Sequence, residues 1–353
     1  ENGASDVGAF ETAPEIVLAG GPGDDDLAGL EGNDMLSGEA GDDLLSGGAG
    51  DDVLAGGNGD DVLAPGAGAD MVLGGAGADR VDYGDASGPV LVHLTRGYAE
   101  VGGARATLTE IEGAAGGDGD DVLIGDADAN VLMGGAGDDR IDGRAGADRM
   151  EGGPGDDIYM IDDPGDVVVE QAGGGNDRIN AFADFAVGPN VEHLVGLFAA
   201  TGLELIGTDG RQQIIGSNLI PEGDIIRGRA GDDRLIGLVG DDVIDGGTGN
   251  DRIFGNSGDD VLFGAAGDDR LTGQFGADRF VMRPGDQNDR ITDFNARGDD
   301  VLDLTAHGFG SFAEVQALMS DTAAGALIDL DGPDSVLMEG FAAVSLQAAD
   351  VLI

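Results

Sequence analysis

The sequence contains no cysteine, no lysine and no tryptophan, and each absence narrows the class of protein. Without cysteine there are neither disulfides nor thiolate metal sites, so a fold that works outside the cell must be stabilised in another way. All 17 basic residues are arginines, against 70 acidic residues, and the formal charge of −53 excludes a nucleic-acid partner. Without lysine there is no P-loop for a nucleotide.

Aromatic residues and long apolar runs are also scarce. Aromatics make up 4% of the chain, and no apolar run approaches the roughly 18 residues of a membrane span. We therefore expect a thin aliphatic core and no membrane span. Residues 1–19 show neither the basic region nor the apolar segment of a Sec-type signal. Bound metal ions are the obvious alternative source of stability for such a chain.

Glycine is abundant, with 69 of 353 residues, and it recurs with a period of nine. Seven consecutive nonapeptides cover residues 20–82, five cover 116–160 and six cover 228–281, which makes 18 repeats. The first position is Gly in 17 of them, the fourth is Gly in 17, the sixth is Asp in 17, and the eighth is apolar in all 18. Four fixed columns at one period are typical of a solenoid built from stacked repeats.

The repeat pattern predicts both the strands and the turns. One obligatory apolar position in nine fits a very short strand whose eighth residue points inward, preceded by a tight glycine-rich turn. Two consecutive repeats then close one coil, with parallel strands in two sheets and turns on alternating edges. The seventh position, often Arg, is expected to face outward. The predicted fold is all-β, a parallel β-roll in three blocks with β insertions between them and a small C-terminal cap that contains a short helix.

The sixth-position aspartates are the candidate metal ligands. They recur on the same edge in every second repeat, which places Asp25 beside Asp43 and Asp34 beside Asp52. Hard oxygen ligands without His or Cys favour Ca²⁺, Mg²⁺ or Mn²⁺ over zinc or copper, and oxygens from flexible backbone favour Ca²⁺ over Mg²⁺. The alternative is that Asp merely favours turns and solvates a surface. The predicted ligands are Asp25, Asp34, Asp43, Asp52, Asp61, Asp70, Asp79, Asp121, Asp139, Asp148, Asp157, Asp233, Asp242, Asp251, Asp260, Asp269 and Asp278.

The number of ions follows from the stacking. Pairing each repeat with the second one after it gives 5, 3 and 4 gaps in the three runs, or about 12 calcium ions. Such ions would neutralise carboxylates that otherwise repel one another, since one apolar side chain per repeat is too little to offset the conformational entropy lost on folding. Calcium is therefore expected to act as the folding switch.

The nonapeptides resemble GGxGxDxUx, the RTX or hemolysin-type calcium-binding repeat. The resemblance covers all 18 repeats, or 162 of 353 positions. It implies a parallel β-roll that binds Ca²⁺ between stacked turns through the sixth-position Asp side chains and turn carbonyls, and that folds once exported. The repeat 125–133 departs from the pattern at Asp128 and Asn130, so the site that Asn130 would share with Asp148 is the exception.

The segments outside the repeats complete the expected organisation. Residues 83–115 and 161–227 resemble the β insertions between RTX blocks, and the second contains a degraded repeat, 207–215, with Gln212 at the ligand position. The predicted divisions are an N-terminal segment 1–19, block one 20–82, an insertion 83–115, block two 116–160, an insertion 161–227, block three 228–281, and a C-terminal cap with a type I secretion signal 282–353.

The tail carries its own signals. Ser311–Glu314 matches a capping box and predicts a short helix. Residues 289–294 and 300–304 resemble the C-terminal region of serralysin-type secreted proteases. The last four residues, 350–353, are one acidic and three apolar residues, and in that family such an ending belongs to an uncleaved type I secretion signal; an ordinary edge strand is the alternative.

No catalytic motif accompanies the repeats. The sequence has no HExxH and no GxSxG. His93, His193 and His307 lie far apart, and core or edge positions are expected for them. Nearly every Asp-Asp pair is the fifth and sixth position of a repeat, which argues against a glycosidase pair. We therefore expect no enzyme within these residues; an unrecognised activity involving His93, His193 or Glu192 is the least favoured hypothesis.

Two functions are consistent with these patterns. The first is a secreted calcium-binding protein that folds on extracellular Ca²⁺ into a rigid acidic β-roll and serves as a non-catalytic surface, S-layer, matrix or adhesion component. The second is the calcium-binding secretion and folding module at the C-terminus of a larger secreted hydrolase or polysaccharide-modifying enzyme. The implied partners are calcium ions and a type I (ABC) secretion apparatus, with self-association or a cell-surface polysaccharide left open, and the implied location is extracellular or at a bacterial cell surface.

Overall fold

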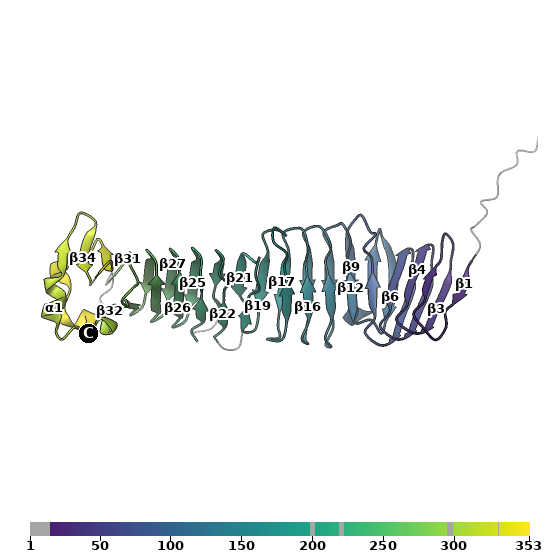
Figure 1. Ribbon diagram of the computed structural model, residues 1–353, viewed down its shortest axis with the longest axis horizontal. Coiled ribbons are helices and arrows are strands. Elements are labelled where there is room, and N and C mark those ends of the chain that lie inside the picture. Colours follow the sequence, from purple (N-terminus) through teal and green to yellow (C-terminus); the bar gives the residue numbers. More distant parts are fainter. Residues whose placement is uncertain (1–14, 198–201, 219–221, 295–298, 331) are drawn as a thin grey trace, which may run out of the picture. The chain divides into compact units, whose positions relative to one another are not determined.

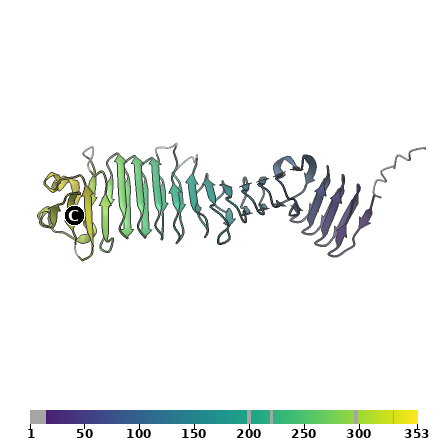
Figure 2. The ribbon, with the colours of Figure 1, turned by 90° about the horizontal axis from the view of Figure 1, so that it is seen from above.

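The computed structural model describes residues 15–197, 202–218, 222–294, 299–330 and 332–353. The chain divides into two units, Glu1–Gly153 and Pro154–Ile353. Each unit is a parallel β-solenoid whose short strands alternate between two sheets, so the all-β prediction is confirmed (Figures 1 and 2).

The first unit contains strands β1 to β16. In order of pairing, its first sheet is formed by β1 (Val17–Ala19), β3 (Met35–Ala40), β5 (Val53–Asn58), β7 (Met71–Ala76), β11 (Ala104–Thr109), β10 (Tyr98–Val101), β9 (Val90–His93), β13 (Val122–Ile124) and β15 (Arg140–Asp142). Its second sheet is formed by β2 (Asp26–Ala28), β4 (Leu44–Ala49), β6 (Val62–Ala67), β8 (Arg80–Asp82), β12 (Gly113–Ala115), β14 (Val131–Met133) and β16 (Arg149–Glu151).

The register confirms that two repeats make one coil. In the pairing of β3 with β5, Leu36 lies beside Leu54, which occupies the same position two repeats further along the chain. The eighth-position side chains are fully buried, except for the half-buried Leu27, and the mainly aliphatic columns that the two sheets contribute face each other in the core. The seventh-position arginines are exposed, except for the half-buried Arg80. The alternation expected from the period therefore holds.

The fourth-position glycines close the turns. Gly50 has a φ of 136°, and a Cβ at this position would overlap the carbonyl oxygen of Gly32 in the preceding coil. Only glycine allows that conformation together with so close an approach of two backbones. The tight stacking of the turns thus depends on this column.

Residues 83–115 add strands to both sheets of the first unit. Strand β10 pairs antiparallel with both β9 and β11, while β11 pairs in parallel with β7 and β9 with β13. Strand β12 lies between β8 and β14 in the other sheet. The 3-10 helix η1 (Leu94–Arg96) connects β9 to β10. The solenoid is therefore continuous through this segment.

The second unit contains strands β17 to β36. In order of pairing, its first sheet is formed by β17 (Ile158–Ile161), β19 (Arg178–Ala181), β21 (His193–Gly196), β23 (Gln213–Ile215), β25 (Arg234–Val239), β27 (Arg252–Ser257), β29 (Arg270–Phe275) and β31 (Asn288–Ile291). Its second sheet is formed by β20 (Phe185–Ala186), β22 (Glu204–Ile206), β24 (Ile225–Arg227), β26 (Val243–Thr248), β28 (Val261–Ala266), β30 (Arg279–Val281), β32 (Val301–Asp303) and β36 (Val351–Leu352). Strand β18 (Val167–Val169) lies between β17 and β19 along the chain.

Coil length varies at the start of this unit. Tyr159 pairs with Ile179, Ile179 with Leu194, and Leu194 with Ile214, so a long coil is followed by a short one and then by another long one. The regular length returns where Leu235 pairs with Ile253. The degraded repeats thus still form coils, but with turns of unequal length.

The end of the chain covers the last coil. Strands β33 (Met319–Asp321), β34 (Gly325–Asp329) and β35 (Ser335–Glu339) form an antiparallel meander, and β35 pairs with β31. The predicted short helix is confirmed as α1 (Phe312–Ala317), which buries Val315. Three 3-10 helices lie nearby, η2 (Thr305–His307), η3 (Ala343–Ser345) and η4 (Ala348–Asp350).

The predicted capping box of α1 is wrong in its details. The Ser311 side chain accepts no main-chain N–H. Instead, the Ser311 hydroxyl donates to Glu314 Oε1 at 3.4 Å, and Glu314 Oε2 accepts the Gly310 N–H at 2.9 Å. The glutamate therefore caps the helix without the reciprocal serine bond. Strand β36 pairs with β32, so the last residues form an edge strand here. Among the described residues, no helix is long and apolar enough to cross a membrane.

Candidate metal sites

The sixth-position aspartates form ladders along the edges of the solenoid. Each lies where a turn meets the next strand, and in most of them Oδ1 accepts the main-chain N–H of the residue one coil earlier. Asp25 N–H donates to Asp43 Oδ1 at 2.8 Å, and Asp34 N–H donates to Asp52 Oδ1 at 2.7 Å. The same bond joins Asp242 to Asp260 at 2.9 Å in the third block. The pairs expected from the period therefore lie side by side.

All the predicted ligands are buried except Asp25, which is half-buried. In Asp25, Asp34 and Asp121 the second oxygen accepts a turn N–H from the same repeat, at 2.6 to 2.9 Å. In a larger group this oxygen is buried and has no hydrogen-bond donor. That group comprises Asp43, Asp52, Asp61, Asp79, Asp233, Asp242, Asp251, Asp260, Asp269 and Asp278. A buried carboxylate oxygen without a hydrogen-bond donor destabilises the folded state. A cation bound next to these atoms would remove that destabilisation.

Main-chain carbonyl oxygens lie near these Oδ2 atoms. Asp43 Oδ2 and the carbonyl oxygen of Gly56 both lie against the first-position glycine Gly38, where a Cβ would overlap them. The same arrangement recurs around Gly237, with Asp242 Oδ2 and the carbonyl of Gly255. Glycine at the first position therefore keeps open a gap lined by carboxylate and carbonyl oxygens. Such a donor set fits Ca²⁺ and contains no ligand that zinc or copper prefers.

Burial changes the acidity of the ladder. It raises the pKa of Asp260 from 3.8 to about 8, and the neighbouring carboxylates of Asp242 and Asp278 act in the same direction. Burial likewise raises the pKa of Asp242 and of Asp278 to about 7. In the first unit it raises the pKa of Asp70 to about 6 and that of Asp139 to about 7. Without a cation, several of these groups would bind protons near neutral pH.

Acidification is expected to promote folding of the calcium-free chain. Because the folded-state pKa of these aspartates is raised, their favourable contribution is present below about pH 4 and is lost as the pH rises through about 6 to 8. Lowering the pH of metal-free protein from about 8 to about 5 should therefore increase the β-sheet circular dichroism. A β signal that grows with rising pH in the absence of metal would contradict this ordering. Calcium affinity should fall over the same range, because protons compete for the ligands.

Two turns satisfy their polar groups without a cation. Asn130 Oδ1 accepts the Asp126 N–H at 2.8 Å, while its Nδ2 donates to the carbonyl of Glu112 at 3.1 Å. Gln212 does the same with the Thr208 N–H at 2.6 Å and the Val191 carbonyl at 2.7 Å. In each case the side-chain amide nitrogen donates a hydrogen bond, which an ionised carboxylate cannot do. At both positions the sequence has an amide side chain where the repeat pattern has the ligand Asp.

Restoring the carboxylate at position 130 is expected to add a metal site. The Asn130→Asp variant loses the amide donor and gains an oxygen near Asp148, whose Oδ1 accepts the Asn130 N–H at 2.7 Å. The calcium stoichiometry measured by isothermal titration calorimetry should rise by one or two ions. Asn176→Asp is the matched control, because Asn176 lies exposed in a turn and the substitution adds the same charge outside the ladder. Equal stoichiometry in the two variants would rule out the added site.

The ladders also contain residues that the repeat pattern does not include. Asp79 N–H donates to Glu112 Oε2 at 2.8 Å, and Asp269 N–H donates to Asp289 Oδ1 at 3.0 Å. Among the described residues, Asp177, Glu192, Asp224 and Asp300 also accept such a bond. The four aspartates among them are followed by a residue of any kind and then an apolar one, as in the sixth to eighth positions of a repeat. That three-residue signal could have identified them without the glycines.

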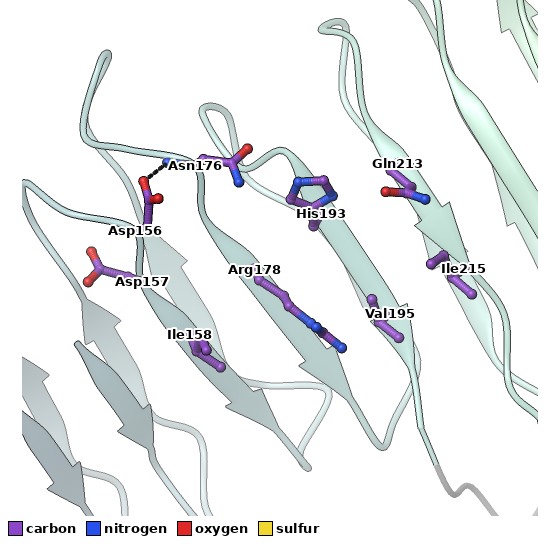
Figure 3. A pocket seen from close by; sticks show the side chains of 9 residues that line it. All are labelled: Asp156, Asp157, Ile158, Asn176, Arg178, His193, Val195, Gln213 and Ile215. Atoms are coloured by element: carbon purple, nitrogen blue, oxygen red, sulfur yellow. Dashed lines mark hydrogen bonds between the residues drawn. The ribbon is translucent and has the colours of Figure 1, made fainter. Parts of the chain in front are cut away.

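The three histidines lie in separate elements. His93 in β9 is buried and packs on the Tyr98 ring, with centroids 5.7 Å apart, and burial lowers its pKa. His193 in β21 is half-buried and lines a hollow beside Arg178 (Figure 3). His307 ends η2. His93 and His193 thus lie in strands, whereas His307 is half-buried in a 3-10 helix.

Comparison with known proteins identifies the repeats. A family model described as the RTX calcium-binding nonapeptide repeat (4 copies) matches residues 19–54, 55–87, 114–140, 124–159, 222–253 and 245–280. No curated protein matches the chain. Among solved structures the chain is similar to the extracellular lipase LipA from Serratia marcescens, with 15% identity and a TM-score of 0.27. The match covers 97% of this chain and 40% of that chain.

Proposed function

Because the chain belongs to the family of RTX calcium-binding nonapeptide-repeat proteins, we propose that it binds calcium along its aspartate ladders and that calcium binding drives its folding. RTX repeats bind Ca²⁺ in general. The observation that supports the proposal for this chain is the column of buried Oδ2 atoms without hydrogen-bond donors. A bound divalent cation supplies the counter-charge at these atoms.

The residues of this chain have separate tasks in that process. The sixth-position carboxylates and the first-position carbonyls hold the ion, as around Gly38. The Oδ1 atom stays occupied by the N–H of the neighbouring coil, as between Asp43 and Asp61 at 2.8 Å. In the folded coils these backbone contacts fix the orientation of the carboxylate, and the second oxygen remains free to ligate.

We further propose that the protein is secreted and works without catalysis. Outside the cell, calcium at the ~10⁻⁴–10⁻³ M typical for extracellular modules would fill the turns, whereas in a calcium-poor cytosol the acidic chain stays unfolded for export. A type I secretion apparatus is the proposed export route, since residues 289–294 and 300–304 resemble the C-terminal region of serralysin-type secreted proteases. The folded product is a rigid acidic surface, matrix or adhesion component.

The second candidate is an export and folding module of a larger secreted hydrolase or polysaccharide-modifying enzyme. It is favoured by residues 289–294 and 300–304, which resemble the tail of serralysin-type proteases. The sequence of the gene upstream of Glu1 distinguishes the two: a catalytic domain encoded there supports the module. The calcium-dependent folding that both share is tested by following β-structure while chelator and Ca²⁺ are titrated.

A further inference from the structure

One coil of the second unit differs from the regular coils. The ladder partners Asp157 and Asp177, which stack across it, are 20 positions apart, against 18 for a regular pair such as Asp233 and Asp251. The residue that follows β18 is Glu170, at the place where the repeats have their first-position glycine. In the regular repeats a Cβ at this place would overlap the ligand carboxylate of the same turn. The turn that leads from Glu170 to Asp177 is longer than the regular one, and the side chain fits.

The glutamate joins two stacked aspartates. Oxygen atoms of Asp157, Glu170 and Asp177 all lie within 4.8 Å of one another. The three side chains are 1%, 7% and 0% exposed, respectively. Asp157 N–H donates to Asp177 Oδ1 at 2.9 Å, which leaves Asp177 Oδ2 buried without a hydrogen-bond donor. Three carboxylates therefore converge where a regular turn brings together two.

The charges around the cluster are negative. Glu192 Oε2 accepts the Asp177 N–H at 2.9 Å, which adds a fourth carboxylate next to the cluster. The Tyr159 hydroxyl donates to Glu170 Oε1 and fixes its direction. Arg178 does not neutralise the cluster: its Nε donates to Asn180 Oδ1 at 2.9 Å, and Figure 3 shows its side chain running along the strand away from Asp157. Burial raises the pKa of Glu170 to about 7.

We propose that Asp157, Glu170 and Asp177 form a divalent-cation site with three carboxylates, distinct from the sites of the repeat turns. This site binds calcium more tightly than the repeat turns and fills before them. The inference deepens the proposed function, since it relies on stacked turns of this solenoid taking up calcium. Affinity for calcium rises with the number of charged oxygen ligands, and this site has one more than a regular turn. It lies at the start of the region where coil length varies, so early binding here orders the coil that the repeats do not define.

Terbium luminescence tests the site directly, because Tb³⁺ replaces Ca²⁺ at oxygen sites and is sensitised by a nearby tyrosine. The chain has three tyrosines and no tryptophan, and Tyr159 bonds to the proposed ligand Glu170. In a Tyr83→Phe/Tyr98→Phe background, tyrosine-sensitised emission should saturate at a Tb³⁺ concentration at least about tenfold below that at which the β-sheet circular dichroism saturates. Added Ca²⁺ should displace this signal. Tyr159→Phe should remove it.

Glu170→Gln is expected to shift the midpoint of the sensitised emission upward by about tenfold or more. Asp156→Asn is the matched control: it removes a neighbouring exposed charge, whose Oδ1 accepts the turn N–H of Asn176 at 2.8 Å, and should leave the midpoint in place. An unchanged midpoint in Glu170→Gln overturns the inference. If Glu170→Gln does not fold, the Tyr83→Phe/Tyr98→Phe protein alone tests the inference. The absence of an early phase of sensitised emission in that protein also overturns the inference. Calcium-dependent folding without that early phase would remove the inference and leave the proposed function intact.

Discussion

Addition of EGTA is expected to abolish the β-sheet circular dichroism of the protein, and excess Ca²⁺ is expected to restore it. The reason is the combination of a formal charge of −53 with buried aspartate oxygens that have no hydrogen-bond donor. Without cations each buried oxygen carries a desolvation penalty of roughly 1–3 kcal/mol. These penalties recur every coil, and the one apolar side chain that each repeat contributes to the core cannot offset them.

The size of the effect follows from linkage. An ion present at 100 times its dissociation constant stabilises the folded state by about 2.7 kcal/mol per site. Several such sites exceed the roughly 5–15 kcal/mol by which ordinary domains are stable. The transition should therefore run from unfolded to fully folded over a narrow range of calcium concentration.

A salt control distinguishes the binding of Ca²⁺ to the ladder oxygens from general screening of the negative charges. Sodium chloride at matched ionic strength screens exposed charges but does not enter a gap lined by carboxylate and carbonyl oxygens. It should recover little β signal in the presence of EGTA. Magnesium should also be a poor substitute, because it needs strict octahedral geometry and keeps its waters. A β spectrum that survives exhaustive chelation would overturn the proposed role of calcium.

The sequence predicts the regular part of this fold well because one local rule repeats. The position of Leu36 beside Leu54 and of Asp34 beside Asp52 follows from a period of nine and two repeats per coil. No long-range information is needed, since each coil contacts its neighbours in the same way. The predicted ligands consequently occupy equivalent positions along the ladders.

The irregular part could not be predicted from the period. Ladder partners 20 and then 15 positions apart follow each other at Asp157, Asp177 and Glu192, and the turns between them have no fixed glycine columns. Whether Glu170 points inward depends on the room made by the longer turn, which is a property of the packed coil. The same holds for Glu112, which joins a ladder through a longer side chain at the end of an insertion.

Asn130 and Gln212 show that a turn without a cation needs a side-chain N–H donor at the ladder position. This requirement leads to a second prediction. Replacement of Asp242, Asp260 and Asp278 by Asn should make the third block more stable in EGTA. In the parent chain Oδ1 of these residues accepts an N–H of the neighbouring coil, at 2.7, 2.9 and 3.1 Å. An amide oxygen can keep that bond, while the nitrogen can donate to a main-chain carbonyl, as Asn130 and Gln212 do.

The triple Asn variant should therefore gain stability without calcium and lose the part of the calcium response that this ladder supplies, because the ladder of Asp233, Asp251 and Asp269 is unchanged. Each exchange removes a buried oxygen without a donor, so the gain in the free energy of unfolding in EGTA should be roughly 1–3 kcal/mol per position. Thermal unfolding followed by circular dichroism, with and without Ca²⁺, measures both quantities. The triple Ala variant is the control, because it removes the same charges but supplies no amide: it should bind fewer ions and gain less stability. Equal behaviour of the Asn and Ala variants would mean that charge removal alone matters, and that the amide contacts of Asn130 and Gln212 contribute nothing to a cation-free turn.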